Sequence, residues 1–159
     1  MADDLGIAAP LRELVLAVER YRAARARGVL GISSTEFVAL GSLYMDGPQT
    51  PTGLAKAAGI TAASATELCD RLERAGLARR EPHATDRRKR LIVLTPRAHA
   101  SLTAIYRELG DIVAPALNPA AVDDITAFLR AAAAALSAAA RNGPHSTPDQ
   151  TGSQEEQPG

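Results

Sequence analysis

The chain of 159 residues has no tryptophan, five aromatic residues in all and a single cysteine. A lone cysteine, Cys69, cannot close an internal disulfide, and this excludes a disulfide-stapled scaffold. Because Cys69 and the three histidines show no paired-ligand spacing, we expect no zinc finger and no other metal site. Without neighbouring aromatic faces, an RNA-stacking platform is not expected. Aliphatic and alanine side chains must supply the core, which favours close-packed helices.

Long apolar segments are also missing. The longest uncharged apolar stretch, residues 131–140, is too short to cross a bilayer. The first residues, Met-Ala-Asp-Asp, lack the basic region of a signal peptide. The histidines have no evident nucleophile partner, and no glycine-rich phosphate loop follows a strand, so an enzyme is the least expected class. We therefore expect a cytoplasmic protein with no cofactor and no membrane contact.

The chain has no net charge, since 18 basic side chains balance 18 acidic ones. Their distribution is uneven. Residues 71–97 contain nine basic and three acidic residues, a net charge of +6, whereas residues 108–159 have a net charge of −5. Such segregation creates a local positive field where a polyanion could dock. The length, with 46% hydrophobic and 23% charged residues, suits one globular domain, with or without an appendage.

Apolar spacing and capping residues predict a mainly α-helical chain with one β-hairpin. Ser33 and Glu36 have the spacing of a capping box, and a tight Gly-Ile-Thr turn separates two short helices as in a helix-turn-helix. The predicted elements are helices over about 10–27, with Gly28 as the stop, 34–46 and 52–58, a helix capped by Thr61 and stopped by Gly76, strands over 77–81 and 90–94 around a basic loop, a helix from Pro96 to about 114, and a last helix from Pro119 to about 140. A hairpin directly after a helix-turn-helix is a wing, so the expected fold class is a winged helix-turn-helix.

Three stretches of the chain resemble one protein family. They are Leu-Ala-Lys-Ala-Ala-Gly-Ile at 54–60, Leu-Cys-Asp-Arg-Leu-Glu-Arg-Ala-Gly-Leu at 68–77 and Asp-Arg-Arg-Lys-Arg-Leu-Ile-Val-Leu-Thr at 86–95. Through them, residues 33–97, and more loosely 10–140, resemble the multiple-antibiotic-resistance regulator (MarR) family of winged helix-turn-helix transcription factors. The last stretch fits the wing signature of that family, Asp-x-Arg followed by an alternating strand and Leu-Thr.

The resemblance implies a homodimer that binds double-stranded DNA at a pseudo-palindromic operator. Such proteins are usually repressors released by a small ligand or by oxidation. The implied organisation is a domain over 10–140, with a DNA-binding lobe at 34–96 and dimerisation helices at 10–27 and 97–140. A winged-helix interaction module, or a DNA binder without operator selectivity, is the alternative.

The helix after Thr61 would be the recognition helix in the major groove, where short polar side chains reach base edges. The cationic wing suits phosphates or a narrow minor groove. The predicted DNA contacts are Thr61, Ser64, Thr66, Arg71, Arg87, Arg88 and Lys89. Asp86 is predicted to brace an arginine, since an acid facing DNA would repel it. A solvated charge run on a hairpin is the alternative for the wing.

The recognition helix departs from the family in being poor in basic groups. Its predicted exposed face carries Ala62, Ala63, Ala65 and Glu67, where many members have basic or larger polar residues. Glu67 either accepts a hydrogen bond from cytosine N4 or pairs with Arg71 four residues later. With few direct base contacts, the wing and backbone contacts would carry more of the binding.

A small aromatic or anionic effector is expected near Tyr21, Tyr44 and His99. This expectation comes mainly from the resemblance, and structural packing is the alternative for each tyrosine. Cys69 lies on the apolar side of its helix and is expected to be buried and inert, with redox sensing as the alternative.

The last part of the chain differs in composition from the rest. Residues 141–159 contain no aliphatic or aromatic residue and are predicted to be a disordered tail. Just before them, residues 131–140 include eight alanines. The apolar stripe of this helix predicts packing against a partner helix, and a solvated helix end is the alternative.

Overall fold

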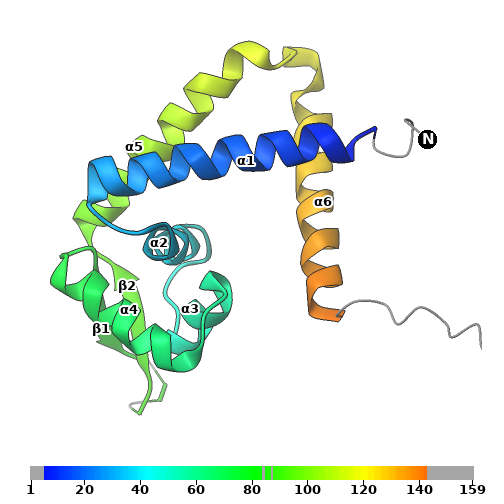
Figure 1. The fold of residues 1–159 in the computed structure, drawn as a ribbon. Helices are drawn as coiled ribbons and strands as arrows, with labels where there is room; N and C mark the ends of the chain where they lie inside the picture. Colours follow the sequence, from blue (N-terminus) through cyan, green and yellow to red (C-terminus); the bar gives the residue numbers. More distant parts are fainter. Residues whose placement is uncertain (1–5, 84, 87, 143–159) are drawn as a thin grey trace, which may run out of the picture. The chain divides into compact units, whose positions relative to one another are not determined.

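The computed structural model describes residues 6–83, 85–86 and 88–142 (Figure 1). The elements in chain order are α1 (Ala8–Arg25), the π-helical turn η2 (Ala26–Leu30), α2 (Ser34–Asp46), α3 (Pro51–Ala58), α4 (Ala62–Arg74), β1 (Ala78–Pro82), β2 (Arg90–Leu94), α5 (Pro96–Val113), the 3-10 turns η3 (Ala114–Ala116) and η4 (Pro119–Ala121), and α6 (Val122–Asn142). The predicted mainly helical fold with a hairpin wing is confirmed. The chain forms two compact units, which divide after Ile112.

The first unit contains the helix-turn-helix and the wing. Strands β1 and β2 pair antiparallel, with Ala78 opposite Leu94. Gln49, just before α3, adds an isolated bridge to β2 through two backbone hydrogen bonds. The Gln49 N–H donates to the Ile92 carbonyl at 3.2 Å, and the Ile92 N–H donates back to Gln49 at 2.7 Å. This bridge ties the start of α3 to the wing.

Aliphatic side chains supply most of the core of the first unit, as the scarcity of aromatics predicts. Phe37 is the one aromatic among the largest fully buried side chains. The others of that group are Leu40, Leu54, Leu68, Leu72, Leu77, Ile92, Leu102 and Cys69. Helix α1 is tied to α5 through the Tyr21 hydroxyl, which donates to the Ile105 carbonyl at 3.1 Å, and through an ion pair between Arg25 and Glu108.

Local capping signals place most helix ends. Ser33 and Glu36 form the predicted capping box of α2, and Thr50 and Thr61 cap α3 and α4. The first helix does not stop at Gly28 as predicted. It continues as a π-helical turn that buries Ala26 and Leu30, and Gly31 ends it with a left-handed φ of 67°. Burial of these two side chains outweighs the weak helix preference of a single glycine.

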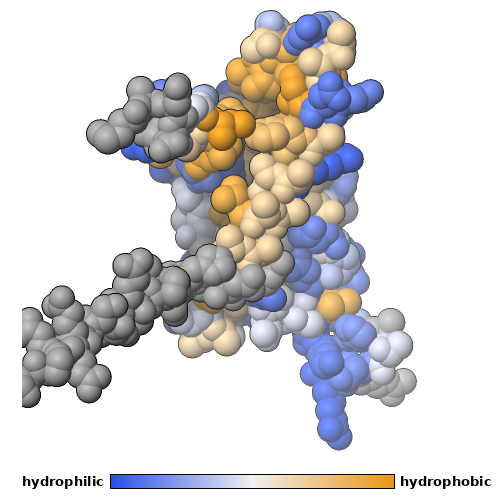
Figure 2. All heavy atoms as spheres, turned by 90° about the vertical axis from the view of Figure 1, so that its right-hand side faces the viewer, coloured by the Kyte–Doolittle hydropathy of each residue, from blue (hydrophilic) through white to orange (hydrophobic). Residues whose placement is uncertain are grey.

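The second unit consists of η3, η4 and the 21-residue helix α6. Asp123 and Asp124 in the first turn of α6 suit the positive end of its dipole. Figure 2 shows an extended run of apolar colour along this helix, and its side chains Phe128, Leu129 and Leu136 are 46%, 45% and 60% exposed. Helix α6 continues to Asn142 and so includes the first two residues of the predicted tail. The remainder of that predicted tail, residues 143–159, lies outside the described residues.

None of the described helices is by itself long and apolar enough to cross a membrane. Two pairs of consecutive described helices reach the length and apolar composition of a membrane span only when both helices of a pair are counted together, and each pair is sharply bent at the break between its helices.

Candidate nucleic-acid interface

Three exposed hydroxyl residues form the α4 tip, defined here as Thr61, Ser64 and Thr66. The Thr61 hydroxyl oxygen accepts a hydrogen bond from the Ser64 backbone N–H at 3.2 Å. It also lies 3.0 Å from the Ser64 hydroxyl oxygen. The cap therefore orients both hydroxyls at the start of the helix, and each keeps capacity for a further hydrogen bond.

Helix α4 buries one face and exposes the other. Ala65, Leu68, Cys69 and Leu72 are each 0% exposed, at the i, i+3, i+4, i+7 spacing of one helix face. The expectation that Ala65 faces outward is wrong, because this spacing places it with the buried leucines. The exposed residues of α4 and its cap are Thr61, Ala62, Ala63, Ser64, Thr66, Glu67, Asp70, Arg71 and Arg74.

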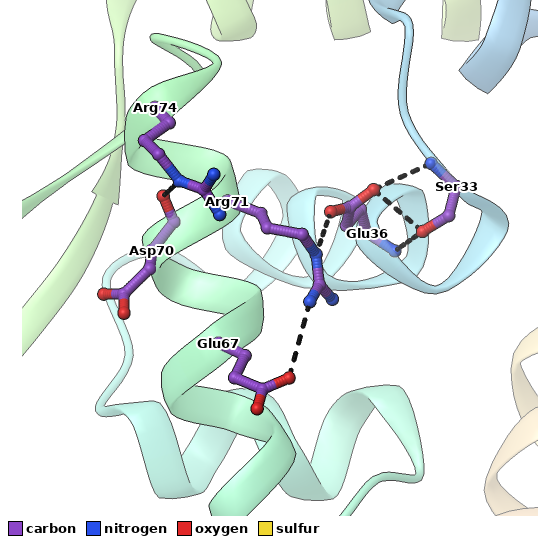
Figure 3. Close-up of polar contacts among 6 residues, drawn as sticks. All are labelled: Ser33, Glu36, Glu67, Asp70, Arg71 and Arg74. Atoms are coloured by element: carbon purple, nitrogen blue, oxygen red, sulfur yellow. Dashed lines mark hydrogen bonds and ion pairs between the residues drawn. The ribbon is translucent and has the colours of Figure 1, made fainter.

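Arg71 joins α4 to α2 through a buried carboxylate (Figure 3). Its Nε donates to Glu36 Oε1 at 2.7 Å. Glu36 Oε2 accepts from both the backbone N–H and the hydroxyl of Ser33, each at 2.8 Å. On its other side, Arg71 Nη1 lies 3.8 Å from Glu67 Oε2. Of the two alternatives for Glu67, the pair with Arg71 is therefore present, and it is continued to Glu36.

The pKa of Glu36 reflects competing influences. Burial raises the pKa of this carboxyl, but the hydrogen bonds from Ser33 and from Arg71, together with the Arg71 charge, outweigh burial and lower it. The carboxylate is therefore held ionised at neutral pH. Local sequence indicates the contact with Ser33, but nothing in the sequence indicates Arg71, which is 35 residues away.

Ion pairs engage several of the basic residues of the wing, defined here as residues 78–94. Arg79 pairs with Glu81 at 2.6 Å, and Arg80 pairs with Asp70 of α4 at 2.7 Å and also with Glu73. The Arg80 backbone N–H adds a bond to Glu73 at 2.8 Å. The positive charge of this region is thus partly compensated, and two of its arginines fix the wing rather than extend its field.

The loop of the wing is braced by Asp86. Its carboxylate accepts from the backbone N–H of Arg88 at 3.1 Å and lies 3.6 Å from the ammonium of Lys89. In the described part of the loop, Asp86 therefore contacts Arg88 through its backbone and Lys89 through its ammonium group. Arg87 lies outside the described residues.

A cationic groove lies between the start of α3 and the wing. Its volume is about 460 Å³, and its lining residues are Thr50, Pro51, Thr52, Arg88, Lys89 and Arg90. Among the residues that the structure describes, neither Arg88 nor Arg90 has a carboxylate within ion-pair distance. Figure 1 shows the wing loop and the start of α4 at the same lower end of the first unit. This end combines exposed cations with exposed hydroxyls.

The residues expected to bind an effector are only partly brought together. The Tyr44 ring lies 5.0 Å from the ring of His99 and 5.3 Å from that of Tyr106. The Tyr44 hydroxyl lies 3.1 Å from that of Thr103. Tyr21 is occupied separately by its hydrogen bond to α5. Packing thus accounts for both tyrosines.

A second pocket, also of about 460 Å³, lies beside this aromatic cluster. Helices α1, α2 and α5 line it, chiefly through Val18, Arg22, Gly41, Tyr106 and Leu109. None of the three expected effector residues belongs to its lining. Arg22 Nε is buried without a hydrogen-bond partner among the described residues, and burial raises the pKa of the Tyr106 hydroxyl. Sequence reasoning missed Arg22 and Tyr106, because neither belongs to a motif.

Cys69 lies in the core of the first unit, as expected. It is 0% exposed, and burial raises the pKa of its thiol. A buried thiol with a raised pKa carries little thiolate at neutral pH, which is the opposite of the setting of a reactive cysteine.

Comparisons with known proteins find one matching family and related transcriptional regulators. A sequence model of the MarR family matches residues 32–89, which span α2 to the wing loop. The HTH-type transcriptional regulator YcgE of Bacillus subtilis is 36% identical over 86 residues, which are 54% of this chain and 51% of YcgE. The match with this curated relative therefore spans about half of its length.

Solved structures show the same fold over more of the chain. Rv1404 from Mycobacterium tuberculosis is 28% identical, with a TM-score of 0.64 over 84% of this chain and 95% of that one. The MarR family transcriptional regulator Sco3205 from Streptomyces coelicolor, solved in complex with DNA, is 22% identical, with a TM-score of 0.62 over 84% of this chain and 87% of its own. The likeness to Sco3205 concerns the fold alone.

Proposed function

Since the chain belongs to the MarR family of transcriptional regulators, we propose that it is a homodimer that represses transcription from a pseudo-palindromic operator and is released by a small effector. The observation that carries the proposal is the end of the first unit where the α4 tip and the cationic wing lie together. A helix with exposed hydroxyls suits the major groove, and free arginines suit phosphates or the adjacent minor groove. Its proposed DNA contacts are those predicted from the sequence except Arg71, which is bonded to Glu36.

The experiment that tests this function is selection of bound duplexes from a random DNA pool. A dimer places its two recognition helices about 34 Å apart. The recovered sequences should therefore contain inverted half-sites about one helical turn apart, centre to centre. A protein-interaction module would retain no DNA. A non-selective DNA binder would retain DNA but would not enrich any sequence.

Arg88→Ala should weaken binding to operator and random duplexes alike, because Arg88 lies in the cationic groove and pairs with no described carboxylate. The slope of log affinity against log salt should shrink by roughly one unit if one phosphate contact is lost. Fluorescence anisotropy over a salt series measures both quantities.

Two matched variants distinguish the proposed roles. Arg79→Ala removes the same charge from the same hairpin, but this arginine already pairs with Glu81, so a smaller change is expected. Ser64→Ala should keep the salt slope and cost roughly 1 kcal/mol at one operator position if its hydroxyl meets a base. If Arg88→Ala leaves the circular dichroism, the DNA affinity and the salt slope unchanged, the wing is a solvated hairpin and does not contact DNA.

The effector is proposed to bind the pocket lined by Arg22 and Tyr106. Arg22 Nη1 pairs with Glu19 at 2.8 Å, but its buried Nε has no partner among the described residues and can donate to an anionic or aromatic acid. A ligand that weakens DNA binding must itself bind less tightly to the DNA complex by the same factor. A Cβ added at Gly41 would lie 2.9 Å from the Tyr106 hydroxyl oxygen. Gly41→Ala should therefore abolish release by a phenolic acid that releases the unaltered protein, while DNA affinity without the acid is retained.

Gly110→Ala is the control, because a Cβ there meets nothing within 4 Å. Anisotropy of the operator complex during titration with the acid measures release. Equal release from the Gly41→Ala and unaltered proteins would place the effector elsewhere.

A further inference from the structure

The exposed face of α4 carries two acidic residues, although the proposed function turns this face toward a polyanion. Asp70 is compensated, because it pairs with Arg80 of the wing at 2.7 Å. The side chain of Glu67 is 79% exposed, and its partner Arg71 is 3.8 Å away and already bonded to Glu36. Arg71 is shared between two carboxylates, so this cluster of three keeps one net negative charge. The excess charge lies at the exposed end of the cluster, on Glu67.

A carboxylate on a DNA-facing surface lowers affinity for every duplex unless a base edge offers it a donor. Only some bases do so in the major groove. Cytosine presents its N4 amino group, guanine presents two acceptors, thymine presents an acceptor and a methyl group, and adenine presents an acceptor beside its donor. A carboxylate therefore accepts from cytosine and is repelled most strongly by guanine.

The neighbours of Glu67 leave room for a base edge to approach. One turn earlier on the same face are Ala63 and Ser64, so only small side chains flank the carboxylate on the side of the helix start. Of the α4 tip, Thr61 lies at the helix start, Ser64 lies one turn before Glu67, and Thr66 directly precedes it in sequence. Glu67 is thus the longest side chain in the first two turns of α4.

Glu67 also faces an arginine that is itself fixed (Figure 3). Glu36 is 7% exposed and fixed by two bonds from Ser33, and it orients the Arg71 guanidinium through Nε. Arg71 then presents Nη1 toward Glu67. A side chain positioned before binding loses less conformational entropy when it meets its base.

From this arrangement, and resting on the proposed function, we propose that Glu67 selects a cytosine in each operator half-site, with Arg71 and Glu36 as the positioning residues that hold its carboxylate. Arg71 then acts on DNA through Glu67 rather than as a phosphate contact. The exposed acid also weakens binding to sequences that lack this cytosine, so it increases the ratio of specific to non-specific affinity.

The test is selection from a random DNA pool with the full-length protein and four variants, followed by affinity measurements on single-base operator variants. The unaltered protein should prefer cytosine at one position of each half-site by about tenfold over the other bases. Glu67→Ala should remove the preference at that position alone. Glu67→Gln should move it toward adenine, because a carboxamide pairs with adenine N6 and N7.

Asp70→Asn is the matched control, since it removes the same unit of charge from the same face while Glu73 still holds Arg80. It should raise affinity for all duplexes and leave the cytosine preference intact. Arg71→Gln should weaken the preference at the Glu67 position and no other, with circular dichroism confirming the fold. A merely structural arginine would lower affinity without such a position-specific change.

The outcomes separate this inference from the function on which it rests. A palindrome recovered equally by the unaltered and Glu67→Ala proteins overturns the role of Glu67 and leaves operator binding standing. Equal changes in base preference for Glu67→Ala and Asp70→Asn show an effect of charge alone and also overturn it. If the unaltered protein enriches no sequence, the proposed function fails first and this inference fails with it.

Discussion

Leu129→Glu is expected to yield a monomer at micromolar concentration and to lower operator affinity by at least about hundredfold. Phe128, Leu129 and Leu136 lie on one side of α6 and are 45% to 60% exposed. A large exposed apolar face marks an interaction surface, and a second copy of the chain is the proposed partner. A buried, unpartnered carboxylate in such an interface is strongly unfavourable. A monomer contacts one half-site only. Binding two half-sites with one dimer raises the affinity by a factor of about 10² to 10⁴, and this gain would be lost.

Light scattering gives the mass of this variant, and anisotropy gives its operator affinity. Ala134→Glu is the control, because it places the same charge on the opposite side of α6, where residue 134 is also exposed. This control should remain dimeric and bind the operator normally. A Leu129→Glu protein that is dimeric, with operator affinity intact, would show that α6 does not form the interface.

Glu36→Ala is expected to lower the free energy of unfolding by about 3 kcal/mol. The substitution removes the acceptor for the Ser33 backbone N–H, the Ser33 hydroxyl and Arg71 Nε. It also removes half of the capping box that starts α2. Urea unfolding should show a lower midpoint with an unchanged slope, since the surface exposed on unfolding stays the same.

The Glu36 contribution should also depend on pH. The pKa of Glu36 is lowered in the folded protein. Its contribution is therefore fully present above the unfolded pKa of about 4 and is lost as the pH falls through the lower folded value. Glu36→Gln keeps the size of the side chain and does not titrate, so its stability should fall less steeply below pH 4. If both proteins lose stability in parallel in acid, the ionised carboxylate at position 36 is not a source of folding energy.

Much of the fold follows from signals within a few residues of one another. The capping box at Ser33, the Thr-Pro start of α3, the glycine after it and the β-branched centre of β2 each act on their own segment. Such signals depend on backbone geometry and local hydrogen bonds, which the neighbouring residues determine. For this reason the predicted order of helices and hairpin agrees with the structure. The first helix is the exception, because burial of Leu30 carries it past Gly28 to Gly31.

The candidate site was predicted in outline and not in its connections. The hydroxyls of the α4 tip and the basic loop could be predicted, because they belong to the helix-turn-helix and wing motifs. The ion pairs of Arg71 with Glu36 and of Arg80 with Asp70 and Glu73 could not be predicted. The sequence offers each arginine several acidic residues, and only the folded chain brings one or two of them within reach. These pairs change the expected role of the residues, because an arginine held by carboxylates positions other groups instead of extending the positive field.

Residue order alone predicted a winged helix-turn-helix and its resemblance to the MarR family, because caps, turns and the wing signature each lie within a short stretch of sequence. Tertiary structure decided which of the described arginines are held by carboxylates and where the pocket lined by Arg22 and Tyr106 lies. Charge pairing and cavities depend on distances between side chains far apart in the chain. The buried carboxylate of Glu36 shows the difference: its contact with Ser33, three residues away, is in the motif, but its contact with Arg71 exists only once α2 and α4 have packed.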